Sequence, residues 1–251
     1  MSDRILQPES GRTWPLPKQP WLMRMTWSDL LFAHWPIEPK TVASRLPAGV
    51  VLDTRDGNAW VGVVPFTMSN VAPRLCPPIP TLNRFLELNL RTYVSVGDRP
   101  GVWFFSLDAS SRIAVRVART TFNLPNMDAK MVIGRDERGV VEYKSQRTHR
   151  GAPSANYAAT YSALGEFYSA KPGTLEHWLT ARYCLYSADR RGRIYRGEID
   201  HPPWKLASAV YAEAINTMGE PFGFSFRGQP HLLFAKPVDV RAWHVRQCDE
   251  E

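Results

Sequence analysis

The sequence predicts a mixed α+β protein that is mainly antiparallel β, with short helices packed outside the strands. Residues 85–94 alternate between two faces, as a strand does, because successive strand side chains point to opposite sides. The pair Asp56-Gly57 lies between two β-rich runs, which favours a tight hairpin turn. The 21 prolines and nine tryptophans argue against a helical bundle, since proline interrupts helices and tryptophan needs broad packing surfaces.

Length and composition fit a globular protein with a sizeable core. The chain has 251 residues, 44% of them hydrophobic, and a mean hydropathy of −0.31. No internal repeat or low-complexity linker divides it, so we expect one domain over residues 1–251. Residues 1–20 are rich in proline and polar side chains, and we expect them to form an extended arm laid over the fold.

Charge and cysteine content bear on partners and location. The net charge of +7 would favour an acidic ligand or a polyanion, but the basic residues are scattered apart from a cluster at residues 190–196. No nucleic-acid-binding module is recognisable, which disfavours nucleic acid as a partner. Three cysteines without a close pair, no apolar leader and no apolar run near the roughly 20 residues of a bilayer span predict a cytoplasmic protein without membrane association.

The first half of the chain is expected to contain five strands and two helices. The arginines at 112, 116 and 119 have helical spacing, and Asp108 is placed to cap that helix. The expected elements are a strand over residues 21–35 with a bend at Ser28-Asp29, a short helix from Pro39 to Leu46, a hairpin of 50–54 with 59–66, strands over 85–94 and 101–107, and a helix over 109–120.

The second half predicts further strands and one short helix. Residues 206–218 fit a helix or a strand, and periodicity does not choose between them. The stretch 152–172 carries no clear pattern. The expected elements are a hairpin of 127–133 with 140–146, a short helix capped by Thr174, strands over 182–187 and 193–199, and a strand over 232–245 broken at Pro237.

The face of residues 85–94 that carries Glu87, Asn89, Arg91 and Tyr93 is the candidate site. If this face meets solvent, these are ordinary surface residues. If it lines a barrel interior, a glutamate beside an arginine forms a charged wall that can bind a carboxylate and move a proton. Asn89 and Tyr93 would then contact the ligand. The alternation alone leaves both interpretations open.

The histidines give no metal site and no cofactor is predicted. All six are dispersed along the sequence, and the common catalytic signatures are missing. His34 precedes Trp35-Pro36, and His201 begins the run His201-Pro202-Pro203-Trp204. Each motif either fixes the structure or places its histidine at the mouth of a pocket, so His34 and His201 are ligand-binding candidates.

Seven segments of the chain carry a family resemblance. In order they are LLFAHWPIEP, LPAGVVLDTRDGNAWVGVVPF, FLELNLRTYV, GVWFFSLDAS, LPNMDAKM, RYCLY and HPPWKL. On these segments the chain resembles the YqjF-like family of uncharacterised bacterial proteins, which is distantly similar to acetoacetate decarboxylases. The resemblance implies a β-barrel-like fold with a central pocket, in which Glu87 falls where the decarboxylases carry a pocket glutamate.

The same resemblance implies a reactive lysine, which this chain lacks at the matching place. The decarboxylases carry two adjacent lysines after the proline of a turn, whereas Pro125 is followed here by Asn126 and Met127, and neither can form an imine. Lys130 is a secondary catalytic candidate. Strand alternation puts it on the same face as Asp128, and a carboxylate would raise the lysine pKa, opposite to what an imine requires.

Three functions follow as hypotheses. The first is a pocket protein that binds or converts a small organic acid or carbonyl compound without a Schiff base, with Glu87 as acid or base and Arg91 as carboxylate anchor. The second is a non-catalytic ligand-binding or structural scaffold. The third, nucleic-acid binding, is the least favoured. Related decarboxylases assemble into oligomers, so the resemblance leaves a homo-oligomer open.

Overall fold

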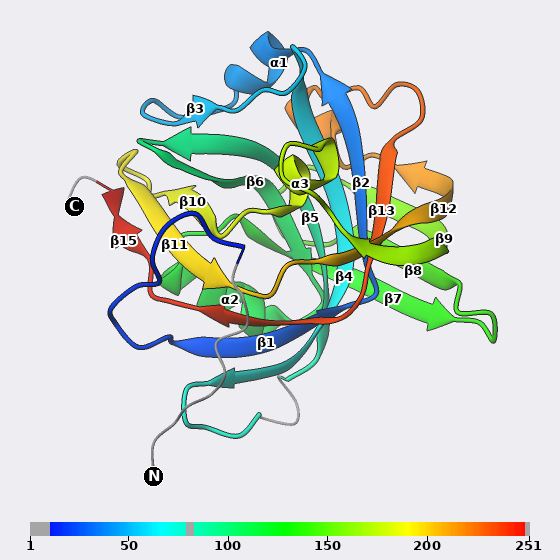
Figure 1. The fold of residues 1–251 in the computed structure, drawn as a ribbon, viewed down its shortest axis with the longest axis horizontal. Coiled ribbons are helices and arrows are strands. Elements are labelled where there is room, and N and C mark those ends of the chain that lie inside the picture. The colour runs from blue at the N-terminus through cyan, green and yellow to red at the C-terminus, as the bar shows by residue number, and fades with distance from the viewer. Residues whose placement is uncertain (1–10, 79–82, 249–251) are drawn as a thin grey trace.

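The computed structural model describes residues 11–78 and 83–248, and strands dominate it (Figure 1). Fifteen strands are found in the described residues: β1 Met23–Ser28, β2 Leu30–Ile37, β3 Val51–Leu52, β4 Ala59–Pro73, β5 Phe85–Val96, β6 Arg99–Ala109, β7 Asn126–Arg135, β8 Val141–Arg147, β9 Asn156–Ser169, β10 Cys184–Ala188, β11 Ile194–Asp200, β12 Lys205–Asn216, β13 His231–Ala235, β14 Val238–Ala242 and β15 Arg246–Gln247. The helices are α1 Pro39–Ala43, α2 Arg112–Thr121, α3 Leu175–Thr180 and the 3-10 turn Glu220–Phe222.

The strand pairings close the sheet. Within the described residues, twelve strands form a ring in the order β1-β14-β11-β10-β6-β7-β8-β9-β12-β13-β2-β4, and β4 pairs back to β1. Strand β5 pairs with both β4 and β6, so it connects two distant members of the ring. Among the strands that the structure describes, only the pairings of β6 with β7 and with β10 are parallel. The predicted mainly antiparallel barrel with short helices is confirmed.

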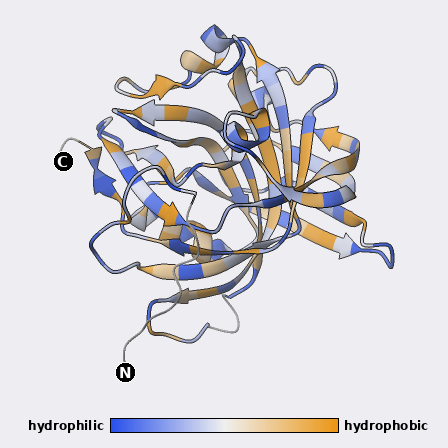
Figure 2. Cartoon of the chain, in the orientation of Figure 1, coloured by the Kyte–Doolittle hydropathy of each residue, from blue (hydrophilic) through white to orange (hydrophobic). Residues whose placement is uncertain are grey.

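Strand β5 separates two apolar cores. The pairings of β5 divide the ring into two circuits that share β4, β5 and β6. Leu86, Leu88 and Leu90 pack into one core with side chains of β2, β4, β8 and β9. Phe85, on the other face of β5, joins a second core with side chains of β1, β4 and β14. Apolar and polar residues accordingly alternate along many strands in Figure 2.

The break between β1 and β2 falls at Asp29, as the sequence predicts. Asp29 has a φ of 53°, a left-handed conformation that ends the regular strand. Its carboxylate accepts a hydrogen bond from Thr67 Oγ1 at 2.9 Å and forms an ion pair with Arg135. These contacts hold the turn, so β1 pairs with β14 while β2 pairs with β13.

The helix following β6 begins later than its predicted start, and its predicted cap is wrong. The side chain of Ser111 accepts the hydrogen bond from the backbone N–H of Ala114, so Ser111 is the N-cap of α2. Asp108 belongs to β6, where its buried carboxylate pairs with Arg147. The predicted cap of α3 is confirmed, because Thr174 accepts from the N–H of His177.

The predicted hairpin at Asp56-Gly57 is wrong in its pairing. Strand β3 pairs with β5, through Val51 and Ser95, and only the bridge between Arg55 and Asn58 remains of the hairpin. The reason is that β4 has no free edge here: it pairs with β2 along one side and with β5 along the other. The second predicted hairpin is confirmed as β7 and β8.

Other elements complete the barrel. Residues 206–218, undecided in the sequence, lie mostly in β12, and the unreadable stretch 152–172 contains its partner β9. Residues 11–20 form no helix or strand, and Arg12 anchors this part of the arm by donating to Glu198 Oε2 at 2.6 Å. Residues 1–10 of the expected arm lie outside the described residues. None of the helices in the described ranges has the length and apolar character to cross a bilayer.

Candidate functional site

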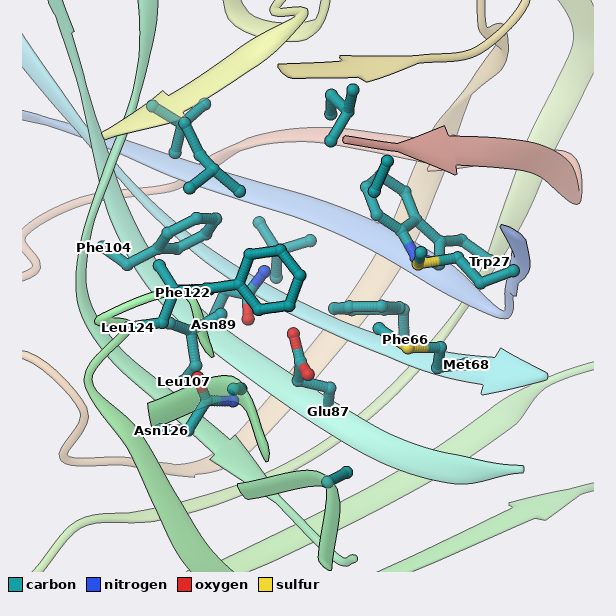
Figure 3. Close-up of a pocket in the computed structure, with 18 of the residues that line it drawn as sticks. Trp27, Phe66, Met68, Glu87, Asn89, Phe104, Leu107, Phe122, Leu124 and Asn126 are labelled. Atoms are coloured by element: carbon teal, nitrogen blue, oxygen red, sulfur yellow. The ribbon is translucent and has the colours of Figure 1, made fainter. Parts of the chain in front are cut away.

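A cavity of about 340 Å³ lies against the face of β5 that carries Glu87, Asn89 and Arg91. Its walls come from β1, β4, β5, β6 and α2, and from segments near residues 180–185 and 199–204. Most of the lining is apolar, with a few polar side chains among it, which is typical of small-molecule sites. Figure 3 shows the Glu87 carboxyl pointing into this space, among Trp27, Phe66, Met68, Phe104, Leu107 and Phe122.

Pairing on both sides of β5 fixes the polar face. Glu87 lies opposite Phe66 on β4 and Ala109 on β6. Asn89 lies between Val64 and Leu107 in the same way. Because side chains alternate along a strand, the leucines between them point into the opposite core. The predicted division of β5 into two faces therefore places Glu87, Asn89 and Arg91 together along one cavity wall.

Glu87 is a buried carboxyl group without a partner. Its residue is 7% exposed, and within the described part of the chain its side chain makes no hydrogen bond or ion pair. Burial raises the pKa of Glu87 to about 8, and the negative charge of Asp108 adds to this shift. Glu87 is therefore mostly protonated at neutral pH, yet close enough to its pKa to exchange a proton readily.

A buried ion pair stands behind this wall. Arg147 Nε donates to both carboxylate oxygens of Asp108, at 3.0 and 3.1 Å, and Arg147 Nη2 donates to Ser106 Oγ at 2.9 Å. Asp108 pairs with Leu88 on β5, so its side chain belongs to the face opposite the cavity. Burial raises the pKa of Asp108, while the Arg147 guanidinium opposes the shift.

Two amide side chains complete the polar wall. Asn89 and Asn126 are 6% and 3% exposed, and the Oδ1 atom of each is buried without a hydrogen-bond partner in the described residues. Trp27 Nε1 is in the same state. All three residues line the cavity, and buried polar atoms in native proteins normally have partners. The unmet hydrogen-bonding capacity of these buried atoms makes the wall a candidate contact for a ligand.

The sequence did not indicate that Asn126 would join this wall. Its position was recognised only as one where the related decarboxylases carry a lysine. The parallel pairing of Leu107 with Asn126 brings the start of β7 beside β6. A parallel pairing joins strands that are distant in the sequence, so no local pattern predicts it. Trp27 was likewise not among the predicted site residues, because it joins the lining only through the pairing of β1 with the distant strand β4.

Arg91 is the cation at one end of the wall. Its Nη2 donates to Tyr93 Oη at 3.3 Å, its guanidinium carbon lies 5.1 Å from the centre of the Phe32 ring, and its buried Nε has no partner in the described residues. It forms no ion pair with a described carboxylate. Arg182, the other arginine in the lining, instead pairs with Asp53 at 2.6 Å. Arg91 thus offers an uncompensated positive charge.

His34 and Tyr93 lie behind Arg91 and do not belong to the cavity lining. Both are fully buried, and His34 Nε2 is 2.5 Å from Tyr93 Oη. Burial, together with the nearby charges of Arg91 and His231, lowers the pKa of His34 well below its usual value. His34 is therefore a neutral group that positions Tyr93, and Tyr93 in turn contacts Arg91.

His201 lines the cavity on a different wall from Glu87. Its ring stacks on Tyr183 with centroids 4.7 Å apart, and its Nδ1 lies 2.8 Å from the carbonyl oxygen of Pro202. Burial lowers its pKa, although Asp200 and backbone hydrogen bonds oppose that effect. Trp204, which follows in the same motif, packs beside it with ring centroids 4.9 Å apart.

Lys130 is exposed on β7 and lies outside the cavity lining. The carboxylate of Asp128 contacts Arg116 and His149. Among the described residues no lysine lines the cavity, and no three His, Cys, Asp or Glu side chains gather as a metal site would require. In the basic cluster at residues 190–196, Arg193 pairs with Asp189.

Solved structures share this fold. MppR, an enduracididine biosynthesis enzyme complexed with pyruvate, matches with a TM-score of 0.62 at 12% identity, covering 92% of this chain and 91% of that one. An acetoacetate decarboxylase-like enzyme from Sphingomonas wittichii RW1 matches at 0.60 and 13% identity, covering 91% and 94%. Acetoacetate decarboxylase from Legionella pneumophila matches at 0.59 and 12%, covering 94% and 92%. At these identities the likeness establishes the fold alone.

Sequence comparisons establish the family. The uncharacterized protein YqjF of Bacillus subtilis is 38% identical over 233 residues, which cover 92% of this chain and 95% of that protein. The model of the DUF2071 family, described as an uncharacterized conserved protein, matches residues 24–239. That range runs from β1 to β14 and includes the whole polar wall of the cavity. The chain belongs to the DUF2071 family, and it is similar to YqjF over most of its length.

Proposed function

We propose that this protein binds a small organic acid or carbonyl compound in the cavity beside β5 and transfers a proton through Glu87. The single observation that carries the proposal is the Glu87 carboxyl, which lies in an apolar cavity without a cationic partner in the described residues and has a pKa raised to about 8. A pKa near neutrality suits a residue that both takes and returns protons.

Each polar group of the wall has a place in this chemistry. As a carboxylate, Glu87 takes the proton from the carbon next to a carbonyl group, and the electron pair of that C–H bond moves onto the carbonyl oxygen as an enolate. Protonated Glu87 returns a proton to carbon or to oxygen. The amides of Asn89 and Asn126 orient the substrate, and Arg91 attracts its carboxylate.

The proposed chemistry runs without an imine. Schiff-base catalysis requires a neutral amine at the substrate carbonyl. Asn126 lines the cavity, whereas Lys130 is exposed outside it. The fold neighbours whose names refer to acetoacetate decarboxylase suggest the class of substrate, a carbonyl acid. The likeness in fold does not place a lysine in the cavity of this chain.

A second candidate is ligand binding without turnover. One observation favours it: two other titratable groups of the lining are engaged, with Arg182 paired to Asp53 and His201 Nδ1 close to the Pro202 carbonyl. Glu87 would then act alone, as a neutral hydrogen-bond donor to a bound carbonyl group. Binding and proton transfer must therefore be measured separately.

Solvent deuterium exchange tests the proposal. Proton NMR would follow exchange at the carbon next to the carbonyl of pyruvate, acetoacetate and 3-oxooctanoate, with the wild type and with Glu87→Gln. We expect the wild type to accelerate exchange for at least one acid, and the variant to lose at least about a hundredfold of that acceleration. Glu166→Gln, at an exposed position on β9, is the matched control.

The outcomes separate the two candidates. Exchange that depends on Glu87 supports proton transfer. If an acid binds saturably but its deuterium exchange is no faster than in buffer alone, proton transfer is rejected and ligand binding without turnover is supported. If acceleration persists in Glu87→Gln, another residue carries the chemistry and the assignment to Glu87 is wrong.

A further inference from the structure

Resting on the proposed function, we propose that the ligand is an elongated amphipathic acid, with its anionic end at Arg91, a carbonyl or hydroxyl group at Glu87, and an apolar end among methionine and phenylalanine side chains. This class differs from three- and four-carbon acids such as pyruvate and acetoacetate. Three features support it: the spacing of the polar residues along β5, the uncompensated charge of Arg91, and the distribution of charge along the cavity.

The spacing along β5 separates Arg91 from Glu87. They lie four residues apart on one strand, so their Cα atoms are about 13 Å apart at the usual rise of a β-strand. A bulge occurs beside them, but its extra residue, Phe105, belongs to β6 and does not shorten β5. The spacing of the two residues therefore favours a ligand longer than a three-carbon acid.

Two contacts fix the position of the Arg91 guanidinium. Its Nη2 bonds to Tyr93, the next residue on the same face in the direction away from Glu87. The Phe32 ring, with its centre 5.1 Å from the guanidinium carbon, holds the group in place. The uncompensated charge and the unpartnered Nε favour a bound anion here, because a desolvated cation without a counter-ion is costly.

Beyond Glu87 the cavity becomes apolar. Following the register away from Arg91, the lining on β5, β4 and β1 includes no charged or amide side chain; its members are Phe85, Met68, Val71, Pro73, Trp27, Met25 and Met23. Methionine adapts to ligands of irregular shape. Such a wall binds the hydrocarbon end of a ligand and disfavours a second charge.

The apolar lining continues to the surface through α2. Ile113 and Val117 line the cavity and are also 56% and 50% exposed. The volume agrees with a larger ligand: at about 340 Å³ the cavity exceeds the roughly 150 Å³ that holds benzene in an engineered protein core. A pyruvate-sized molecule would leave most of this apolar surface without contacts.

A chain-length series tests the inference on the full-length protein. Calorimetric titration with butanoate, hexanoate and octanoate should give affinities that rise with length, at least about tenfold from butanoate to octanoate, because each added CH₂ buries apolar area. Octanamide, which lacks the charge, should bind more weakly than octanoate. Arg91→Gln should remove that preference for the charged ligand, while Arg138→Gln at an exposed turn position should keep it.

A second variant examines the apolar end. Met68→Gln keeps the length of the side chain but adds a polar amide. It should weaken the binding of octanoate by about tenfold and have little effect on the binding of butanoate. Thermal unfolding of each variant checks that it is folded. The length series on the wild type answers the question even if a variant is unstable.

The results distinguish this inference from the proposed function. If butanoate and octanoate bind equally and Glu87-dependent exchange persists, the elongated ligand is wrong and proton transfer stands. If affinity rises with length but no acid exchanges in a Glu87-dependent way, the ligand class stands and the proton transfer is wrong. Stronger binding of octanamide than octanoate would overturn the anionic end at Arg91.

Discussion

Arg91 Nη2 donates to the hydroxyl oxygen of Tyr93 across 3.3 Å, and this contact fixes the position of the guanidinium. Tyr93 is fixed in turn by His34, whose Nε2 lies 2.5 Å from the same hydroxyl. The cavity wall therefore has two separate polar positions, a cation at one end and a protonated carboxyl farther along β5. This separation distinguishes a site for an elongated acid from one in which charge and acid meet on a single small molecule.

The first prediction concerns the pH dependence of stability. The folded-state pKa of Glu87, about 8, exceeds its ordinary value of 4.5, so between these values the unfolded chain loses this proton and the folded chain keeps it. Stability should fall as pH rises through that window, by up to about 1.4 kcal/mol per pH unit, and level off above pH 8. Glu87→Gln removes this contribution.

Chemical denaturation at several pH values measures it. The free energy of unfolding of Glu87→Gln minus that of the wild type should increase from pH 5 to pH 8 and then remain constant. Glu166→Gln should give a flat difference. If the free energies of unfolding of Glu87→Gln and the wild type change in parallel with pH, Glu87 ionises at its ordinary pKa and the prediction is wrong.

The second prediction concerns the ion pair of Asp108 and Arg147. Both side chains are at most 1% exposed. Arg147→Met should cost about 3–5 kcal/mol, because it leaves a buried carboxylate without its partner. Adding Asp108→Asn should recover part of this loss. The double variant should therefore lose less free energy of unfolding than the two single variants lose together. Urea denaturation checks this, and a loss below about 1 kcal/mol for Arg147→Met would contradict it.

The third prediction concerns Gly62, which packs under His34. A Cβ atom at residue 62 would lie 2.7 Å from His34 Nε2, the atom that contacts Tyr93. Gly62→Ala should therefore displace His34 and destabilise the protein by about 1–3 kcal/mol. Gly134→Ala is the control, because its nearest atom would be 3.9 Å away. Equal melting temperatures for the two variants would show that the histidine moves without cost.

The fourth prediction concerns Lys130. Because this lysine is exposed outside the cavity, borohydride treatment in the presence of acetoacetate or 3-oxooctanoate should add no mass to the intact protein. Lys130→Ala should also retain the exchange activity and the ligand affinity of the wild type. A reduced adduct that maps to Lys130 would restore the imine mechanism.

Local patterns in the sequence predicted the strands better than their partners. The alternation of residues 85–94 divided β5 correctly into a leucine face and a polar face. The Asp56-Gly57 turn suggested a hairpin, yet β3 pairs with β5 because both edges of β4 are taken. Pairing between distant strands depends on which edges remain free, and no local pattern records that.

The residues of the site were likewise predictable where they share one strand, and not where distant strands bring them together. Glu87, Asn89 and Arg91 were recognised because one strand carries all three at period-two spacing. Asn126 and Trp27 reach the cavity only through the pairings of β7 with β6 and of β1 with β4. The sequence also could not indicate that His34 and Tyr93 lie behind Arg91, because burial of that depth depends on the closure of the whole ring.

The most direct test of the account is a carbon-13 NMR titration of the side-chain carboxyl groups in protein labelled at glutamate, with Glu87→Gln used to assign the resonance. Our interpretation predicts that one carboxyl signal, lost in the variant, remains in its protonated position at pH 7 and titrates near pH 8. If the Glu87 signal titrates instead near its ordinary value of 4.5, the carboxyl is ionised at neutral pH and the proposed role of Glu87 is wrong.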